Sequence, residues 1–202
     1  MIVTSEYRQF IGDLKARVTA ARLSTARHIN RDLINLYWDI GQAIDEKQAV
    51  MGWGESVVEV IARDLSAAFP GTTGFSPQNV WRMLQLYRTY TDAQFISQLV
   101  RELPKDELIR EQTETLSQRV RDLVAAVPWG HHANALAKLN DPAARLYYLR
   151  ATARLGWSRN VLLNQIKAGA YERAKVENKT HNFDLALPEH LSEQADVYMP
   201  RS

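Results

Sequence analysis

The fold is decided in the stretch "GFSPQNVWRMLQLYRTY", residues 74–90, which begins as a capped helix begins and keeps one polar face. Ser76 can accept a hydrogen bond from a first-turn N–H, Pro77 suits the first helical position, and Phe75 can pack onto Val80. At 100° per residue, apolar side chains return on one side of this helix and polar side chains return on the other. The apolar side comprises Val80, Met83, Leu84 and Tyr87, and the polar stripe comprises Gln78, Arg82, Gln85 and Thr89. The pattern predicts an amphipathic helix with a buried face and a face presented to solvent.

Helical periodicity continues along most of the chain and predicts an all-α fold. The N-terminal region, residues 7–48, is interpreted as one long helix or two helices that meet near residues 24–30. The stretch "MGWG" at residues 51–54 ends it, and a second helix over residues 55–69 is expected to bury Val58, Ile61, Leu65 and Phe69. From residue 116 onward, four more helices are expected. They cover residues 116–127, a short helix that begins within "PWGHH" at 128–132 and ends at about 139, residues 142–155, and residues 159–168.

Two capped helices repeat a local pattern and suggest two helix-turn-helix or winged-helix-like units. "FSPQNVWRML" at residues 75–84 and "WSRNVLLNQI" at residues 157–166 share an aromatic residue, a serine cap and an Asn-Val pair. We therefore divide the chain into residues 1–91, a charged connector with some helix at 92–115, a second helical unit at 116–180, and a C-terminal tail at 181–202. The first turn is longer than the three or four residues of a tight helix-turn-helix.

Composition excludes several classes of protein. The chain has 202 residues, 46% of them hydrophobic, a formal charge of +2 and no cysteine, which excludes a disordered chain, disulfides and thiolate metal sites. No export signal and no apolar run of about 20 residues is present, so we expect a cytoplasmic protein that does not enter a membrane. The pI near 8.9 conceals a local excess of positive charge, because residues 143–175 contain seven Lys or Arg against Glu172 alone.

The sequence shows no positive sign of catalysis, and we predict neither catalytic residues, a metal nor a cofactor. "VENK" at residues 176–179 has the E-x-K order of many nucleases, but no credible strand carries it, and a polar loop is the better interpretation. His131 and His132 are adjacent, so on a helix they diverge by about 100° and do not share one zinc ion. We expect this pair at the start of a helix, with one ring packed and the other in water.

Two helices, together with two arginines of a third, are the candidate nucleic-acid contacts. Amide and arginine side chains can read base edges, and arginines and lysines can hold phosphates, although both helix faces fit an ordinary solvated surface equally well. The candidate DNA-binding residues are Gln78, Asn79, Trp81, Arg82, Gln85, Arg88, Arg150, Arg154, Arg159, Asn160, Asn164 and Lys167.

The apolar spacing of the first helix indicates a contact with another chain. It exceeds what a short helix facing solvent requires, so we expect a homodimer or a larger closed oligomer. The expected seam contains Tyr7, Ile11, Leu14 and Val18.

Four long segments together resemble one bacterial family. They are "LYWDIGQAI" at residues 36–44, the segment from "GWGESVVEVI" to "WRMLQLY" at 52–87, the segment from "VPWGHHANAL" to "VLLNQI" at 127–166, and "NFDLALPEHLSEQAD" at 182–196. These segments resemble the YhcG-like family, which contains the domain of unknown function 1016. Members join an all-helical N-terminal domain, often described as winged-helix-like, to a C-terminal PD-(D/E)XK nuclease domain.

The resemblance implies a DNA-linked context such as defence, restriction or mobile-element biology. The present chain ends in "VYMPRS", where the family runs on into the nuclease half, so we expect a noncatalytic DNA-binding or targeting domain. The first alternative is a protein-interaction module that assembles with itself or with a nuclease or other subunit. The second is a nuclease fragment that another chain completes.

Overall fold

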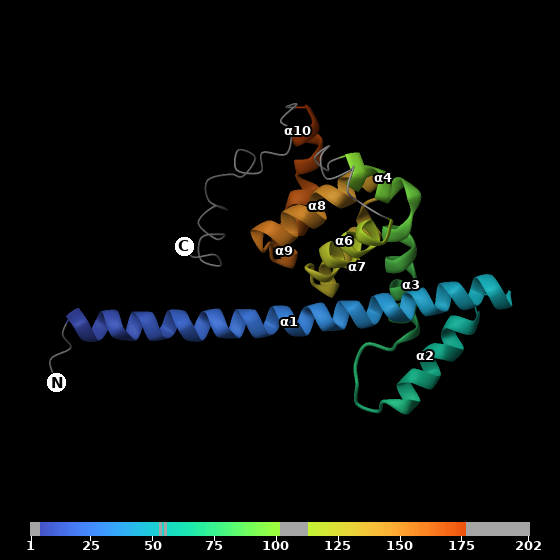
Figure 1. Ribbon diagram of the computed structural model, residues 1–202, viewed down its shortest axis with the longest axis horizontal. Helices are drawn as coiled ribbons and strands as arrows, with labels where there is room; N and C mark the ends of the chain where they lie inside the picture. The colour runs from blue at the N-terminus through green and yellow to red at the C-terminus, as the bar shows by residue number, and fades with distance from the viewer. Residues whose placement is uncertain (1–4, 53, 55, 102–112, 177–202) are drawn as a thin grey trace.

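The computed structural model describes residues 5–52, 54, 56–101 and 113–176, and every regular element there is a helix (Figure 1). The helices are α1 (Ser5–Met51), α2 (Ser56–Ala68), α3 (Pro77–Thr91), α4 (Ala93–Arg101), α6 (Thr113–Ala125), α7 (Trp129–Lys138), α8 (Pro142–Leu155), α9 (Arg159–Lys167) and α10 (Ala170–Val176). The all-α prediction is confirmed. Within these residues there is no strand, and therefore no wing accompanies the predicted helix-turn-helix units there.

The N-terminal region is one continuous helix of 47 residues, which settles the alternative between one helix and two. Its buried residues lie only between Ile34 and Ile44, where α3 packs against it. The first half of α1 projects beyond the helical body as an arm, with α2 on the other side of the helix from the body (Figure 1). We call residues 5–22 of α1 the arm.

The opening stretch forms α3, the helix against which α1, α2, α4 and α7 pack. The Ser76 side chain accepts a hydrogen bond from the Asn79 N–H at 3.3 Å, and Pro77 is the first helical residue, as predicted. Val80, Met83 and Leu84 are buried, and Tyr87 is half-buried. Phe75 is also buried, and it packs with Tyr37 and Met83. The α3 prediction is therefore confirmed in its serine cap, its first residue and its buried face, whereas Phe75 and Val80, expected to pack together, belong to different buried clusters.

Close packing of α1 on α3 depends on Gly41. A β-carbon at this position would overlap the Met83 carbonyl oxygen, so only glycine permits the two helices to approach so closely here. Gly41 lies in the interior of α1, where glycine costs helix stability, and the packing is the physical reason for its presence.

One core joins the two units that the sequence suggested. The largest cluster of buried side chains takes residues from α1, α3, α4, α6, α7 and α8, among them Trp38, Tyr90 and Leu146. The interval expected as a charged connector contains α4, whose Phe95 and Leu99 are buried in that cluster. α4 joins the core because residues 93–101 have an amphipathic pattern. From the sequence alone, this pattern was not separated from the acidic residues around it.

Two expectations about single side chains are wrong. Phe69 is 53% exposed, because α2 ends at Ala68 and Phe69 lies in the turn that follows. His131 and His132 do begin α7, but both rings are buried, since one packs against the segment before α9 and the other against α6 and α3.

The C-terminal helices follow the expected bounds closely. α8 and α9 begin at the predicted residues, and Ser158 caps α9 by accepting a hydrogen bond from the Val161 N–H. Trp157 and Leu162 are buried in one cluster, and α10 extends the helical region further than the sequence indicated. None of the described helices, α1 included, carries a stretch apolar enough to span a bilayer. Residues 177–202, which include "ENK" and the tail, lie outside the described residues.

Candidate nucleic-acid interface

The first candidate surface is the solvent face of α3. Gln78, Gln85 and Arg88 are exposed, whereas Trp81 and Arg82 are half-buried. These five side chains and that of Leu84 line an open hollow along the helix. Trp81 packs at the edge of the cluster between α1, α2 and α3, so only part of its ring faces the hollow.

Two of the α3 candidates are held by bonds inside the protein. The Arg88 guanidinium donates to Asp45 Oδ1 at 2.6 Å and to Gln48 Oε1 at 2.8 Å, which ties α3 to α1. The Asn79 amide donates to the Gly74 carbonyl at 2.6 Å and accepts from Trp129 Nε1 at 2.8 Å. Of the predicted α3 contacts, the polar side chains of Gln78, Arg82 and Gln85, and that of Trp81, are therefore engaged by no such bond among the described residues.

The second candidate surface is formed by α8 and α9. Arg154, Arg159, Asn160, Asn164 and Lys167 are exposed. Arg150, one turn before Arg154 on α8, is half-buried, and desolvation lowers the pKa of its guanidinium from the usual value. The α9 candidates thus form a polar and basic face on a short capped helix.

The structure does not merge these two surfaces into one helix pair. α7 lies between α3 and α9 and contacts both helices (Figure 1). Its first turn reaches both sides, through the Trp129–Asn79 hydrogen bond to α3 and through the hydrogen bond of His131 Nε2 with the carbonyl of Trp157, just before α9. The start of α3 and the start of α9 therefore each lie beside α7, which separates them.

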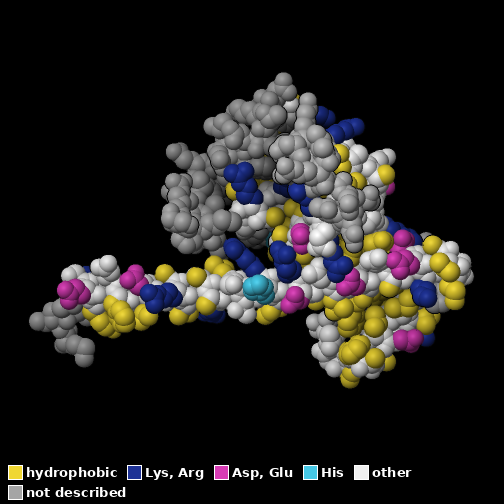
Figure 2. Space-filling view, viewed as in Figure 1, with side chains coloured by type: hydrophobic (Ala, Val, Ile, Leu, Met, Phe, Trp, Pro, Cys, Tyr) yellow, Lys and Arg dark blue, Asp and Glu magenta, His cyan; other side chains and the backbone are white. Residues whose placement is uncertain are grey.

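A third basic region lies where α1 meets the body. Lys and Arg side chains lie along the arm and on the part of the body above it (Figure 2). A hollow of about 350 Å³ separates α1 from the residues that follow α6 and from the end of α8. We call it the α1–α8 hollow; its walls are Leu23, Ala26, Arg27, Asn30, Arg31, Ala125, Ala126, Pro128, Thr152, Ala153, Gly156 and Trp157.

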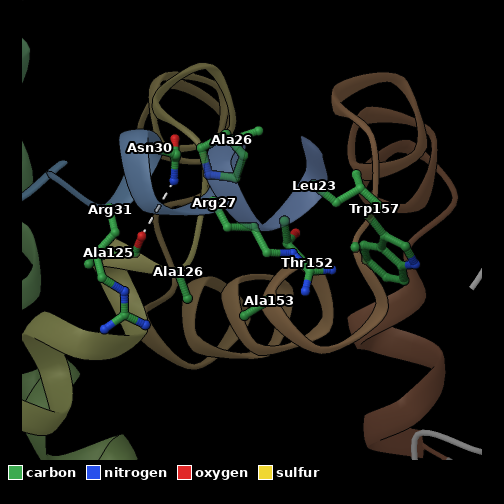
Figure 3. A pocket seen from close by; sticks show the side chains of 12 residues that line it. Leu23, Ala26, Arg27, Asn30, Arg31, Ala125, Ala126, Thr152, Ala153 and Trp157 are labelled. Carbon is green, nitrogen blue, oxygen red and sulfur yellow. Dashed lines mark hydrogen bonds between the residues drawn. The ribbon is translucent and has the colours of Figure 1, made fainter. Parts of the chain in front are cut away.

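The polar groups of the α1–α8 hollow are mostly hydrogen-bond donors. The side chain of Arg27 extends from α1 toward Thr152 on α8 (Figure 3), and it has no ion pair or hydrogen bond with any described residue. Arg31 lies 3.5 Å from Asp122, and both side chains of that pair are about half exposed. Asn30 donates to the Ala125 carbonyl at 3.4 Å. The hollow therefore offers a guanidinium that no described side chain neutralises.

Two residues that line this hollow also carry a buried polar atom without a partner. The Thr152 hydroxyl oxygen and the Trp157 indole nitrogen have no hydrogen bond to the described part of the chain, although the two residues are 4% and 9% exposed. A buried polar group without a partner costs roughly 1–3 kcal/mol, which is a reason to expect a ligand or water there. Cationic and neutral donors together fit an anion such as a phosphate.

Sequence reasoning missed this hollow because its two sides are far apart along the chain. One signal was available: Arg27 precedes the buried Ile34 by seven residues, so both side chains lie on the same face of α1. That Thr152 lies opposite Arg27 follows only from the packing of α8. No group of three or more Asp, Glu or His side chains that could hold a metal ion occurs in the described ranges.

The predicted seam residues all lie in the arm. Tyr7, Leu14 and Val18 are exposed, and Ile11 is half-buried. Except for Ile11, every side chain from residue 5 to residue 22 is exposed.

Comparison with known proteins identifies the class to which this helical fold belongs. Residues 13–173 match the family described as DUF1016 N-terminal domain. The chain belongs to this family, and the resemblance seen in the sequence is confirmed.

One relative is the Escherichia coli (strain K12) protein named "Putative nuclease YhcG". The chain is 25% identical to it over 203 aligned positions, which cover 96% of this chain and 52% of that protein. The chain thus spans about half the length of this curated relative. No solved structure matches the chain.

Proposed function

We propose that this chain is a noncatalytic DNA-binding or targeting domain of a nuclease-family protein. The observation that carries the proposal is the α1–α8 hollow, in which Arg27, with no described partner, extends toward Thr152, whose buried hydroxyl also lacks one (Figure 3). The name of the E. coli relative supports a nucleic-acid context, and the matched family is an N-terminal domain.

Phosphate contacts are assigned to the hollow and to the basic helices beside it. Arg27 and Arg31 approach from α1, and α9 begins with Arg159, two residues after Trp157 in the wall of the hollow. Neutralising phosphates releases counterions, so contacts of this kind supply affinity that is independent of base sequence. Arg154, Arg159 and Lys167 extend this surface along α8 and α9.

Base contacts are assigned to the hollow on α3. Gln78, Arg82 and Gln85 present amide and guanidinium groups there. Amide side chains can form paired hydrogen bonds with the edge of adenine, and guanidinium groups can do so with the edge of guanine. Arg88 and Asn79 are given structural roles, because their bonds to α1, α7 and the turn before α3 hold the helix in place.

Fluorescence anisotropy on a random duplex at two salt concentrations tests the proposal. We expect binding that weakens steeply with salt, and we expect Arg27→Ala and Lys167→Ala each to weaken binding to all sequences and flatten the salt dependence by about one unit. Arg82→Ala should cost about 1–3 kcal/mol on a preferred sequence, because a bidentate contact to a base is lost.

The control is Arg63→Ala, which removes an exposed cation from α2, on the other side of α1 from the body. It should bind DNA as the unmodified chain does. Weak binding that salt and all of these substitutions leave unchanged would overturn the proposal and favour a protein-interaction module.

A further inference from the structure

Exposed hydrophobic side chains are concentrated on a single helix. Of the twelve large hydrophobic side chains exposed among the described residues, nine belong to α1. They are Tyr7, Phe10, Leu14, Val18, Ile29, Leu33, Leu36, Val50 and Met51. Scattered exposed hydrophobic residues are normal, but a concentration on one element marks an interaction surface.

Six of these side chains fall within about 60° of one another around α1 and form what we call the α1 stripe: Tyr7, Leu14, Val18, Ile29, Leu36 and Val50. At 100° per residue, Leu14, Val18 and Leu36 fall within about 40° of one another, and the buried Ile34 and Gly41 fall on the opposite side. Hydrophobic side chains accordingly gather on the edge of the arm that faces away from the body (Figure 2). The α1 stripe is therefore a second apolar face, separate from the face that builds the core.

The arm needs a partner for physical reasons. Residues 5–22 extend for about 27 Å with almost every side chain exposed, so among the described residues the arm lacks the tertiary packing from which most protein helices gain their stability. Burial of the α1 stripe against another helix would supply the missing stabilisation.

The α1 stripe is complementary to itself when two copies of α1 run in opposite directions. With a two-fold axis level with residue 27, residue n of one copy faces residue 54 − n of the other, as an isologous dimer requires. The facing pairs are Ile11 with Ala43, Leu14 with Ile40, Val18 with Leu36, Ala21 with Leu33, and Thr25 with Ile29.

Charge favours the same antiparallel orientation. Residues 5–31 of α1 carry six Lys or Arg against two Asp or Glu, and residues 32–51 carry four Asp or Glu against Lys47. Asp39 and Asp45 already pair with Arg121 and Arg88, but Asp32 and Glu46 have no ion pair with the described residues. Antiparallel packing sets the basic half on the acidic half, whereas parallel packing sets like charges together.

The acidic half of α1 has room for a second helix. α2 covers one flank of α1, where Val58 packs with Ile44, and leaves Leu36 and Ala43 exposed beside it. A partner helix along the α1 stripe would then contact α1 and α2 together, as in a three-helix arrangement.

We propose that two copies of this chain form an antiparallel dimer in which the arm of each protomer packs along residues 32–49 of its partner. This interface is independent of the proposed DNA contacts, because the α1 stripe and Arg27 lie on different faces of α1.

Thiol cross-linking tests the orientation, since the chain contains no cysteine of its own. A mixture of the Val18→Cys and Leu36→Cys chains should give cross-linked heterodimers with a short bis-maleimide. Val18→Cys alone should not, because its two copies would lie about 27 Å apart along the antiparallel pair. Efficient cross-linking of Val18→Cys alone would indicate parallel packing and overturn the proposal.

Sedimentation of the full chain tests the dimer itself. We expect the mass of two chains at tens of micromolar, and we expect Val18→Asp to raise the dissociation constant at least tenfold while the circular dichroism of the body persists. Leu14→Glu provides an independent variant of the same face. A mass of one chain for the unmodified protein would overturn the proposal.

Discussion

At the scale of single residues, His132 is fully buried and neutral. The Val124 carbonyl can only accept, so Nε2 of His132 carries the proton and donates to it at 2.9 Å, and Nδ1 accepts from the Tyr90 hydroxyl at 3.2 Å. Desolvation lowers the pKa of His132 to about 4, against 6.5 for a free imidazole. Burial likewise lowers the pKa of His131.

A loss of stability in mild acid follows from His132. The unfolded chain binds a proton near pH 6.5, whereas the folded chain resists protonation until about pH 4, so the free energy of unfolding falls as the pH drops through this interval. We expect His132 to account for a loss of about 3 kcal/mol between pH 7 and pH 4. Urea denaturation at a series of pH values measures it.

Substitutions at two histidines separate this effect from general acid sensitivity. His132→Gln should flatten the pH dependence of unfolding, whatever its effect on stability at pH 7. His28→Gln, the same substitution on the exposed surface of α1, is the matched control. If the free energy of unfolding changed equally steeply with pH for His132→Gln and for the unmodified chain, the assignment of this effect to His132 would be contradicted.

At the scale of elements, two glycines in α1 have opposite surroundings. Gly41 lies against α3, where an added β-carbon would overlap the Met83 carbonyl and come within 3.0 Å of Tyr87 Cβ. Gly12 lies in the arm, where an added β-carbon would meet nothing within 4 Å. The same substitution therefore acts on packing at one position and on helix propensity alone at the other.

We expect Gly41→Ala to destabilise the protein by about 1–3 kcal/mol, because crowding at the α1–α3 contact outweighs the gain in helix propensity. Gly12→Ala should stabilise α1 by up to about 1 kcal/mol. Thermal unfolding followed by circular dichroism distinguishes them. A Gly41→Ala protein as stable as the unmodified chain would show that α1 and α3 can separate without cost.

At the scale of the whole molecule, the matched family is an N-terminal domain, and the chain covers about half of its E. coli relative. We predict that the purified chain does not cleave plasmid DNA with Mg²⁺ or Mn²⁺, since its sequence shows no carboxylate cluster of the kind that holds a nuclease metal. Gel electrophoresis of supercoiled plasmid measures this. Cleavage that Glu177→Ala abolishes would instead make "VENK" an active site.

The sequence by itself determined the local features of this protein. Ser76 and Ser158 cap α3 and α9 because a side-chain hydroxyl next to the first turn satisfies an N–H that the helix leaves free, and this chemistry involves only neighbours in the chain. The all-α class and the bounds of α8 and α9 follow from local periodicity in the same way. Family membership could also be predicted from the sequence, because several long segments, in the same order along the chain, resemble the family.

Only the tertiary structure decided which polar side chains remain available for a ligand. Arg88 and Asn79 have the same local signature as Arg82 and Gln78, yet their partners are far away in the sequence, on α1 and α7. Arg27 and Thr152 meet across a hollow for the same reason, since α8 reaches α1 only when the core closes. Periodicity shows which side of a helix is apolar, but the neighbour that covers that side, or leaves it open as along the α1 stripe, depends on packing between distant segments.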